Sequence, residues 1–369
     1  MIYFDHAATS VPLGQAVDGA QQYLYQQFYN PAAMYKGAVD ALRALNGARE
    51  TLLNAAGCAR THELVFTSGG TEGDNTVLFS AGKRGRVVVT AGEHAAVYES
   101  CKLLKQSGVE VVLAPVNKHG GVDTEKLLSY VDEKTSLVSV MHVNNETGAV
   151  NDILSIARRV KQKNPRCLFM SDGVQAFCKI PVSLSGDIDF YVTSAHKIGG
   201  LKGTGALIKK KGVNLTPYLI GGGQEGGARS GTQNVYGAVC FSLAAALRQD
   251  SLAENIQKIT SCREMLFELL DKERFVRISP QEGSPYILTV AAGGVRGEVL
   301  QRVLWDRGIA VGTGSACNSK KPFSRVIEAC GYPKEILNGV LRMSFSPETT
   351  KEEIARCAEE CNAAVAAWK

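Results

Sequence analysis

A lysine at the end of an apolar segment is the strongest candidate for chemistry in this sequence. Ser194-Ala195-His196-Lys197 follows a run of β-forming residues and precedes a glycine-rich stretch over residues 198–205. A lysine amine at a strand end can reach into a cleft and form a Schiff base with a carbonyl carbon. A solvated lysine in a turn is the ordinary alternative for so short a motif. Support for Lys197 must therefore come from elsewhere in the chain.

A carboxylate occupies the same kind of position earlier in the chain. Asp172 ends another apolar segment, and Gln175 follows it. A carboxylate against the ring nitrogen of pyridoxal 5'-phosphate (PLP) keeps that nitrogen protonated, so that the ring acts as an electron sink. Gln175 could then hydrogen-bond the ring oxygen. The alternative is that Asp172 caps the next helix.

Small and polar residues follow three further expected strands. Residues 67–75 read Thr-Ser-Gly-Gly-Thr-Glu-Gly-Asp-Asn, and small residues before a helix let backbone N–H groups approach a phosphate. The segment matches neither the dinucleotide fingerprint nor a P-loop. His94 begins a helix after the next strand, where an imidazole can stack on a planar ring or move protons. Asn145 suits a polar contact in a cleft better than a strand interior.

The ten cysteines include no Cys-x-x-Cys pair, so the sequence predicts no structural zinc or iron–sulfur site. Most of them should fill the core, as Cys357 and Cys361 do on the apolar stripe of the last helix. Cys317 differs, because it lies in the small-residue stretch over residues 312–319. Small residues make a loop that can carry a thiol into and out of a cleft, and exposure favours the reactive thiolate.

These residues must be positioned by an alternation of short strands and helices. Expected strands, several of them nearly all apolar, cover residues 64–67, 86–90, 109–113, 137–143, 167–171, 189–193 and 205–209. Expected helices cover residues 38–56, 71–81, 94–106, 123–131 and 153–162. The pattern predicts an α/β fold with a mainly parallel sheet covered by helices on both faces. Ligands of such sheets bind outside the carboxyl ends of the strands.

The texture changes after about residue 250, where a long helix leads into short strands and helices. A chain of 369 residues is also long for one core. We therefore expect a large domain over residues 13–250. A smaller α+β domain should comprise residues 1–12 and 251–369, ending in a helix that starts with a Thr350-x-x-Glu353 capping box.

Composition excludes several other classes of protein. The net charge of +5 is small, and no concentrated basic stretch indicates a nucleic-acid partner. No apolar run reaches the ~18 residues of a membrane span. The N-terminal residues lack the basic and apolar regions of a secretory signal, which predicts a cytoplasmic protein.

In their order and spacing, these segments resemble the cysteine desulfurases, which belong to the class V aminotransferase group of fold-type-I PLP-dependent enzymes. The resemblance covers nearly the whole chain. The matching runs are Thr-Ser-Gly-Gly-Thr-Glu at 67–72, Glu-His at 93–94, His-Val-Asn-Asn-Glu-Thr-Gly at 142–148, Asp-Gly-Val-Gln at 172–175, Ser-Ala-His-Lys at 194–197, Arg-Ser-Gly-Thr at 229–232 and Gly-Ser-Ala-Cys at 314–317. It implies a fold-type-I transferase with a seven-stranded sheet in its large domain.

The resemblance also implies how PLP is held. Lys197 would bind the cofactor covalently and then act as the base that moves protons. Asp172 would pair with the pyridine nitrogen, Gln175 with the ring oxygen, and His94 would stack over the ring. The phosphate group would be held by residues of two subunits of a homodimer: Gly70, Thr71, Ser194 and His196 of one, and Thr232 of the other.

The substrate implied is L-cysteine, with its carboxylate held by Asn145 and by the guanidinium fork of Arg342. Asn30 matches the early substrate-side loop of the family. Cys317 would attack the substrate sulfur, which leaves a persulfide on the protein and releases alanine.

The sequence differs from the housekeeping cysteine desulfurases in several features that bear on which molecule accepts the sulfur. The segment over residues 318–331 is a little shorter, Arg342 is followed by no second arginine, and Tyr35 replaces an expected histidine. The chain also ends at Lys369, without the extension that docks the iron–sulfur scaffold. The acceptor is therefore open between an iron–sulfur scaffold, a tRNA-thiolation protein and a protein of the thiamine pathway.

Three other classes of function compete with desulfuration: another PLP-dependent reaction, a non-catalytic scaffold and a nicotinamide oxidoreductase. Selenocysteine lyase or aminotransferase activity would use the same fold, and aminotransfer would not need Cys317. A non-catalytic scaffold is disfavoured by the joint presence of Lys197, Asp172, His94 and Cys317. A nicotinamide oxidoreductase is disfavoured by the absence of the dinucleotide fingerprint.

Overall fold

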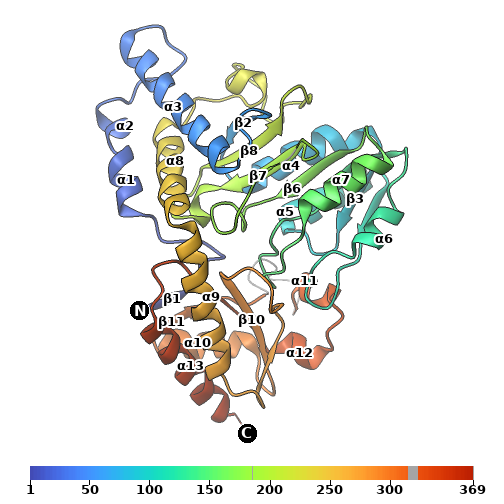
Figure 1. Ribbon diagram of the computed structural model, residues 1–369, viewed down its shortest axis with the longest axis vertical. Coiled ribbons are helices and arrows are strands. Elements are labelled where there is room, and N and C mark those ends of the chain that lie inside the picture. The colour runs from blue at the N-terminus through green and yellow to red at the C-terminus, as the bar shows by residue number, and fades with distance from the viewer. Residues whose placement is uncertain (185, 315–322, 369) are drawn as a thin grey trace.

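The computed structural model describes residues 1–184, 186–314 and 323–368 (Figure 1). Its largest sheet has seven strands in the order β2-β8-β7-β6-β5-β3-β4. In chain order these strands are β2 (His62–Thr67), β3 (Arg86–Thr90), β4 (Val111–Ala114), β5 (Thr135–Ser139), β6 (Leu168–Asp172), β7 (Phe190–Ser194) and β8 (Gly205–Lys210). The sheet is mainly parallel, as predicted, with β8 antiparallel to both of its neighbours.

One expected strand is wrong in its limits. The sequence suggested a strand over residues 137–143, whereas β5 ends at Ser139. Beyond it, Val143 bridges to Val150 across a turn, which carries Asn145 away from the sheet. An apolar run alone could not separate the strand from the start of this turn, because both are buried.

Helices cover both faces of the sheet. One face carries α1 (Gly14–Ala20), α3 (Lys36–Ala55), α6 (Thr124–Ser129), α7 (Ile153–Lys163) and α8 (Val235–Asp250). The other face carries α4 (Gly70–Ala81) and α5 (Ala95–Gln106). The short α2 (Gln22–Tyr25) follows α1.

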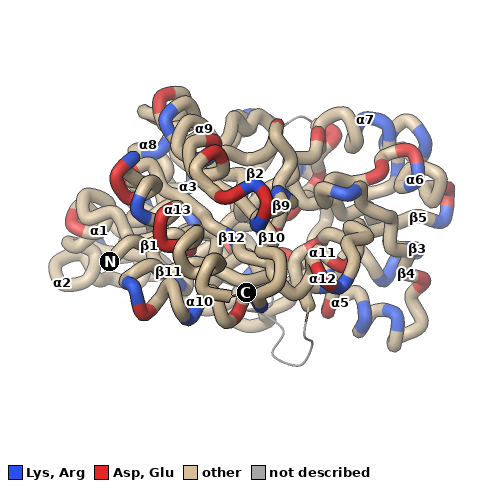
Figure 2. The backbone as a smooth tube through the Cα atoms, turned by 90° about the horizontal axis from the view of Figure 1, so that it is seen from below, with Lys and Arg blue, Asp and Glu red and all other residues tan. Residues whose placement is uncertain are grey.

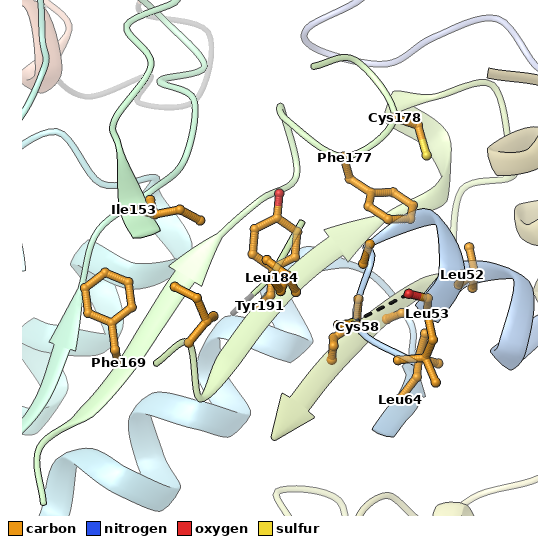
Figure 3. Close-up of a cluster of buried hydrophobic side chains, with 14 of the residues drawn as sticks. Leu52, Leu53, Cys58, Leu64, Ile153, Phe169, Phe177, Cys178, Leu184 and Tyr191 are labelled. Atoms are coloured by element: carbon orange, nitrogen blue, oxygen red, sulfur yellow. Dashed lines mark hydrogen bonds between the residues drawn. The ribbon is translucent and has the colours of Figure 1, made fainter. Parts of the chain in front are cut away.

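The central strands are nearly all apolar because both of their faces are buried. Phe169 and Tyr191 pack with Phe177, Cys178 and the α3 residues in one core (Figure 3). Their strand neighbours, Met170, Phe190 and Val192, pack in the core on the opposite face. Alternation of side chains along each strand thus supplies two cores from one run of residues.

A second region has its own core. Strand β1 (Ile2–Phe4) pairs in parallel with β11 (Ile309–Val311), so the N-terminus joins elements from the end of the chain (Figure 1). Beside them lies an antiparallel sheet of β9 (Phe275–Arg277), β10 (Ile287–Ala292) and β12 (Val340–Ser344). The helices of this region are α9 (Leu252–Leu269), α10 (Gly297–Asp306), α11 (Arg325–Ala329), α12 (Lys334–Asn338) and α13 (Lys351–Ala366).

These elements have a hydrophobic core of their own, as a separate small domain would. The residue limits of the two domains stay a prediction. The capping box at the start of α13 is present, with both reciprocal hydrogen bonds between Thr350 and Glu353. Basic and acidic residues are interspersed over the tube in Figure 2. Among the described residues, no helix combines the length and apolar character needed to cross a membrane.

Candidate active site

A cavity of about 340 Å³ lies where the carboxyl ends of the strands meet the second core. The large sheet and its connections contribute most of the lining: Gly70, Thr71, Asp74, His94, Asn145, Glu146, Asp172, Gln175, Ser194, His196 and Lys197. The remaining polar lining comes from the C-terminal part of the chain: Thr313, Ser324, Arg325 and Arg342. The site therefore forms at the edge that the parallel strand order predicts.

Lys197 is held at this edge by the N-terminal segment. Strand β7 ends at Ser194, and a single 3₁₀ turn over residues 195–197 projects the lysine into the cavity. Lys197 Nζ donates to the backbone oxygens of Ala7 and Ala8, at 2.6 and 2.7 Å. The Ser10 hydroxyl donates to the Lys197 carbonyl at 3.1 Å. Residues far apart in the sequence thus fix the position of the amine.

Three buried carboxyl groups lie together beneath the cavity. Asp172 ends β6, and its Oδ1 accepts from the Val174 N–H at 2.9 Å. Burial raises the pKa of Asp172, while the nearby His94 and Lys197 lower it. Asp74 is 1% exposed and its Oδ1 has no hydrogen-bond partner, and burial, together with the charge of Asp172, raises its pKa well above the usual range.

The third carboxyl group, Glu93, is fully buried. It accepts from Thr90 Oγ1 and from the Met141 N–H, each at 2.8 Å, yet burial raises its pKa to about 7. Like charges this close oppose simultaneous ionisation. Asp172, which accepts from the Val174 N–H and lies near Lys197, is the member best stabilised as a carboxylate. Asp74, which has no donor on Oδ1, is the member that stays protonated.

His94 is oriented by the helix that it caps. Its Nδ1 accepts from the Ala96 N–H at 3.2 Å at the start of α5, so the neutral ring carries its proton on Nε2. Burial lowers the pKa of His94, which favours the neutral ring. The ligand atoms of His94, Asp74 and Asp172 all lie within 4.8 Å of one another.

The N-terminus of α4 opens onto the same cavity at Gly70 and Thr71. A Cβ on Gly70 would lie 2.7 Å from Val174 Cγ2, so glycine permits this close packing. Backbone N–H groups at a helix N-terminus favour an anion. Glu72 in the first turn accepts from Arg229 Nε at 2.9 Å, which ties the segment over residues 229–232 to this helix.

Arg342 brings a guanidinium from β12 to the other side of the cavity. It is 7% exposed and donates to the Asn145 carbonyl and to Asp5 Oδ1, both at 2.8 Å. Its Nε has no partner, and neither has Asn145 Oδ1. Buried polar groups are nearly always hydrogen-bonded, so unpartnered ones that line a cavity indicate a polar ligand.

Two further features of the cavity, the contact between Ser324 and Glu146 and the guanidinium of Arg325, were not predicted from the sequence. The Ser324 hydroxyl donates to the buried Glu146. Arg325 donates to the Ala91 and Glu93 carbonyls, and its guanidinium lies 3.9 Å from the centroid of the Tyr98 ring. These contacts join α11 to the turn before His94. Glu146 stood within a segment singled out above, whereas Arg325 did not.

Comparison with known proteins places this site in a family. The model of aminotransferase class V matches residues 2–357. A cysteine desulfurase IscS of Methanosarcina thermophila is 35% identical, covering 97% of this chain and 90% of its own length. A cysteine desulfurase of a Nostoc species is 36% identical, with 97% and 91% covered. A solved NifS-like protein superposes with a TM-score of 0.93 at 33% identity, covering 99% of both chains.

This chain belongs to the cysteine desulfurases of the class V aminotransferase family. The predicted family and fold are thereby confirmed, and so is dependence on PLP, the cofactor of that family.

The residues of this desulfurase fit PLP. A carboxylate at Asp172 suits a protonated ring nitrogen, and the α4 N-terminus with Ser194 and His196 suits a phosphate. Lys197 has its amine within the same cavity. Ten of the residues predicted from the sequence line this one cavity: Gly70, Thr71, His94, Asn145, Asp172, Gln175, Ser194, His196, Lys197 and Arg342.

Two predicted residues of the desulfurase that the structure describes, Asn30 and Thr232, do not line it. Asn30 is exposed, and its Oδ1 accepts from the Ala32 N–H. Thr232 is also exposed and lies outside the cavity that a single chain forms. Cys317 lies outside the described residues. The roles of these three residues stay predictions.

Proposed function

We propose that this desulfurase converts L-cysteine to L-alanine and transfers the sulfur to Cys317 as a persulfide. The observation that carries the proposal is one cavity that unites Lys197, Asp172 and His94 with two residues, Arg342 and Asn145, whose Nε and Oδ1 atoms respectively have no hydrogen-bond partner. A small zwitterionic amino acid is a substrate that such groups can hold.

Arg342 and Asn145 would bind the substrate carboxylate. Arg342 has five N–H donors, and the contacts with Asn145 and Asp5 each engage one. The Nε–H remains available for a ligand. A planar guanidinium suits a carboxylate because two parallel hydrogen bonds can form.

The residues around Lys197 would control protons at the substrate. PLP, when bound, supplies an electron sink that weakens bonds to the substrate carbons. Lys197, which lines the same cavity as Arg342, would take the proton from Cα and return one to the carbon chain. His94, kept neutral by burial, can hold or pass a proton through Nε2.

The sulfur transfer balances without an external oxidant. The Cys317 thiolate attacks the substrate sulfur; the Cβ–S bond breaks as an S–S bond forms on Cys317. Cβ gains a proton and leaves as the methyl group of alanine. The terminal sulfur then passes to an acceptor, for which an iron–sulfur scaffold, a tRNA-thiolation protein and a protein of the thiamine pathway stay the candidates.

We also propose a homodimer, in which Thr232 would reach the partner's phosphate site. Large apolar side chains are exposed on the segments around α2 and around residues 218–220, as an unpaired interface would leave them. They are Leu24, Tyr25, Phe28, Met34, Tyr35, Tyr218, Leu219 and Ile220. Cytoplasmic location likewise stays a prediction.

The first experiment is a stoichiometry. Purified holoenzyme receives L-cysteine and a thiol reductant, and alanine and sulfide are quantified together. Equal amounts are expected, since the reductant releases the persulfide sulfur. Cys317→Ser should retain the cofactor absorbance and form neither product, because the sulfur acceptor is gone. Cys262→Ala, at a buried position in α9, is the matched control and should keep activity. Undiminished sulfide from Cys317→Ser would refute the persulfide.

A further inference from the structure

Lys179 is a buried lysine that the proposed reaction does not use. It is 6% exposed, lies seven residues after Asp172 at the end of β6, and does not line the substrate cavity. Burial lowers the pKa of Lys179 well below its usual range, and the charges of Lys197 and Arg248 lower it further. Because burying an amine costs desolvation free energy, a lysine at such a position is expected to have a role.

The Lys179 amine contacts the side chain of Gln175. Lys179 Nζ donates to Gln175 Oε1 at 3.0 Å, and both groups are buried. On its other side, Gln175 Nε2 donates to the Ala7 carbonyl at 2.8 Å. That same carbonyl accepts from Lys197 Nζ at 2.6 Å. A continuous chain of hydrogen bonds thus links Lys179 to the wall of the cavity beside Lys197.

These contacts leave only one orientation for the Gln175 amide. Reversing it would place Oε1 against the Ala7 carbonyl, where two acceptors would meet, and Nε2 against the amine. Lys179 therefore engages the amide oxygen of Gln175, a residue that lines the cavity. The amide has two N–H donors, and the one not used by Ala7 is left for a ligand.

We propose that Lys179 is a positioning residue that fixes Gln175 as a hydrogen-bond donor to the ring oxygen of the bound cofactor. This inference rests on cofactor binding and on the proposed contact between Gln175 and the ring. It does not depend on which amino acid is the substrate. A donor to an anionic ring oxygen stabilises the deprotonated form of the Schiff base more than the protonated form, so its loss should raise the pKa of that linkage.

The test is a double-mutant cycle with Lys179→Met, Gln175→Met and the double variant. Methionine keeps the length of each side chain but removes its polar end. The readout is the pH midpoint of the visible absorbance of the holoenzyme, without substrate. Each single variant should raise the midpoint by about one unit, which is a tenfold change in the protonation equilibrium. The double variant should show no further shift, because one interaction is lost only once.

Two controls separate positioning from other roles. Lys202→Met removes an exposed cation five residues after Lys197 in the chain and should leave the midpoint unchanged. Thermal unfolding of the cofactor-free proteins should show Lys179→Met to be no less stable than the wild type, because an amine no longer has to be desolvated. An unmoved midpoint with a lowered melting temperature would make Lys179 a structural residue. Additive shifts of the two single variants would mean that Lys179 acts through its own charge, which also overturns the proposal.

Discussion

Replacing Arg342 by lysine tests how this desulfurase holds its substrate carboxylate. Lysine keeps the charge but concentrates its donors on one nitrogen, so it cannot contact Asn145, Asp5 and a ligand in the way that a fork can. The buried guanidinium makes two contacts at 2.8 Å and keeps its Nε–H for the ligand. We expect the loss of about one charge-assisted hydrogen bond to the substrate.

Such a bond contributes roughly 1.5–3 kcal/mol, which corresponds to a roughly 10- to 150-fold rise in KM for L-cysteine. The carboxylate does not react, so its binding is similar in the ground and transition states, and kcat should change much less than KM. The assay is alanine formation over a range of L-cysteine concentrations. Cofactor absorbance serves as the check that PLP is still bound. A KM within twofold of the wild type would refute the assignment of Arg342.

Gly312 allows the same reasoning to be tested without changing a polar group. A Cβ at Gly312 would lie 2.7 Å from Asp5 Oδ1 and 3.0 Å from an Arg342 nitrogen, so the ion pair must shift. Gly312→Ala should therefore raise KM in the same direction as Arg342→Lys. Gly47→Ala is the matched control, because a Cβ there meets nothing within 4 Å in α3, and KM should stay unchanged.

Three more predictions follow from buried groups. Asp74→Asn should leave the PLP dissociation constant and kcat within about twofold of the wild type, since asparagine mimics a protonated carboxyl. Asp172→Asn should instead lower kcat at least tenfold. Cofactor titration measures the dissociation constant, and steady-state assays measure kcat. Cys178 has a φ of 56°, so Cys178→Gly should be about 1 kcal/mol more stable than Cys178→Ala in urea unfolding. Burial lowers the pKa of His142 from 6.5 to about 4. The unfolded chain therefore binds the extra proton, and the free energy of unfolding should fall as the pH drops from about 6.5 to about 4. His142→Gln should make that slope shallower by up to about 1.4 kcal/mol per pH unit.

Each of these predictions has a contrary result. Strong loss of activity in Asp74→Asn would mean that Asp74 is charged when PLP binds. If Cys178→Ala were more stable than Cys178→Gly, the positive φ at position 178 would not strain the backbone. An unchanged pH slope in His142→Gln would mean that His142 is protonated in the folded protein.

The sequence alone determined those parts of the site that depend on residues close together in the chain. Strands that are apolar throughout indicated a sheet buried on both faces, and parallel strands place their carboxyl ends at one edge. Asp172 and Ser194, at the last positions of β6 and β7, therefore had to lie near each other. The α13 capping box needed only its own residues. The antiparallel direction of β8 had no such local signature, since direction depends on how the chain returns.

Tertiary structure alone decided the contacts that close the site. Arg342 lines the same cavity as Asp172 because β12, a strand of the three-stranded sheet, meets the cavity at the carboxyl ends of the large sheet. Ala7 accepts from both Gln175 and Lys197 because the N-terminal segment crosses the ends of β6 and β7. Arg325 contacts the turn before His94 in the same long-range manner. Periodicity reports which face of an element is buried, but it carries no information about which distant element buries it.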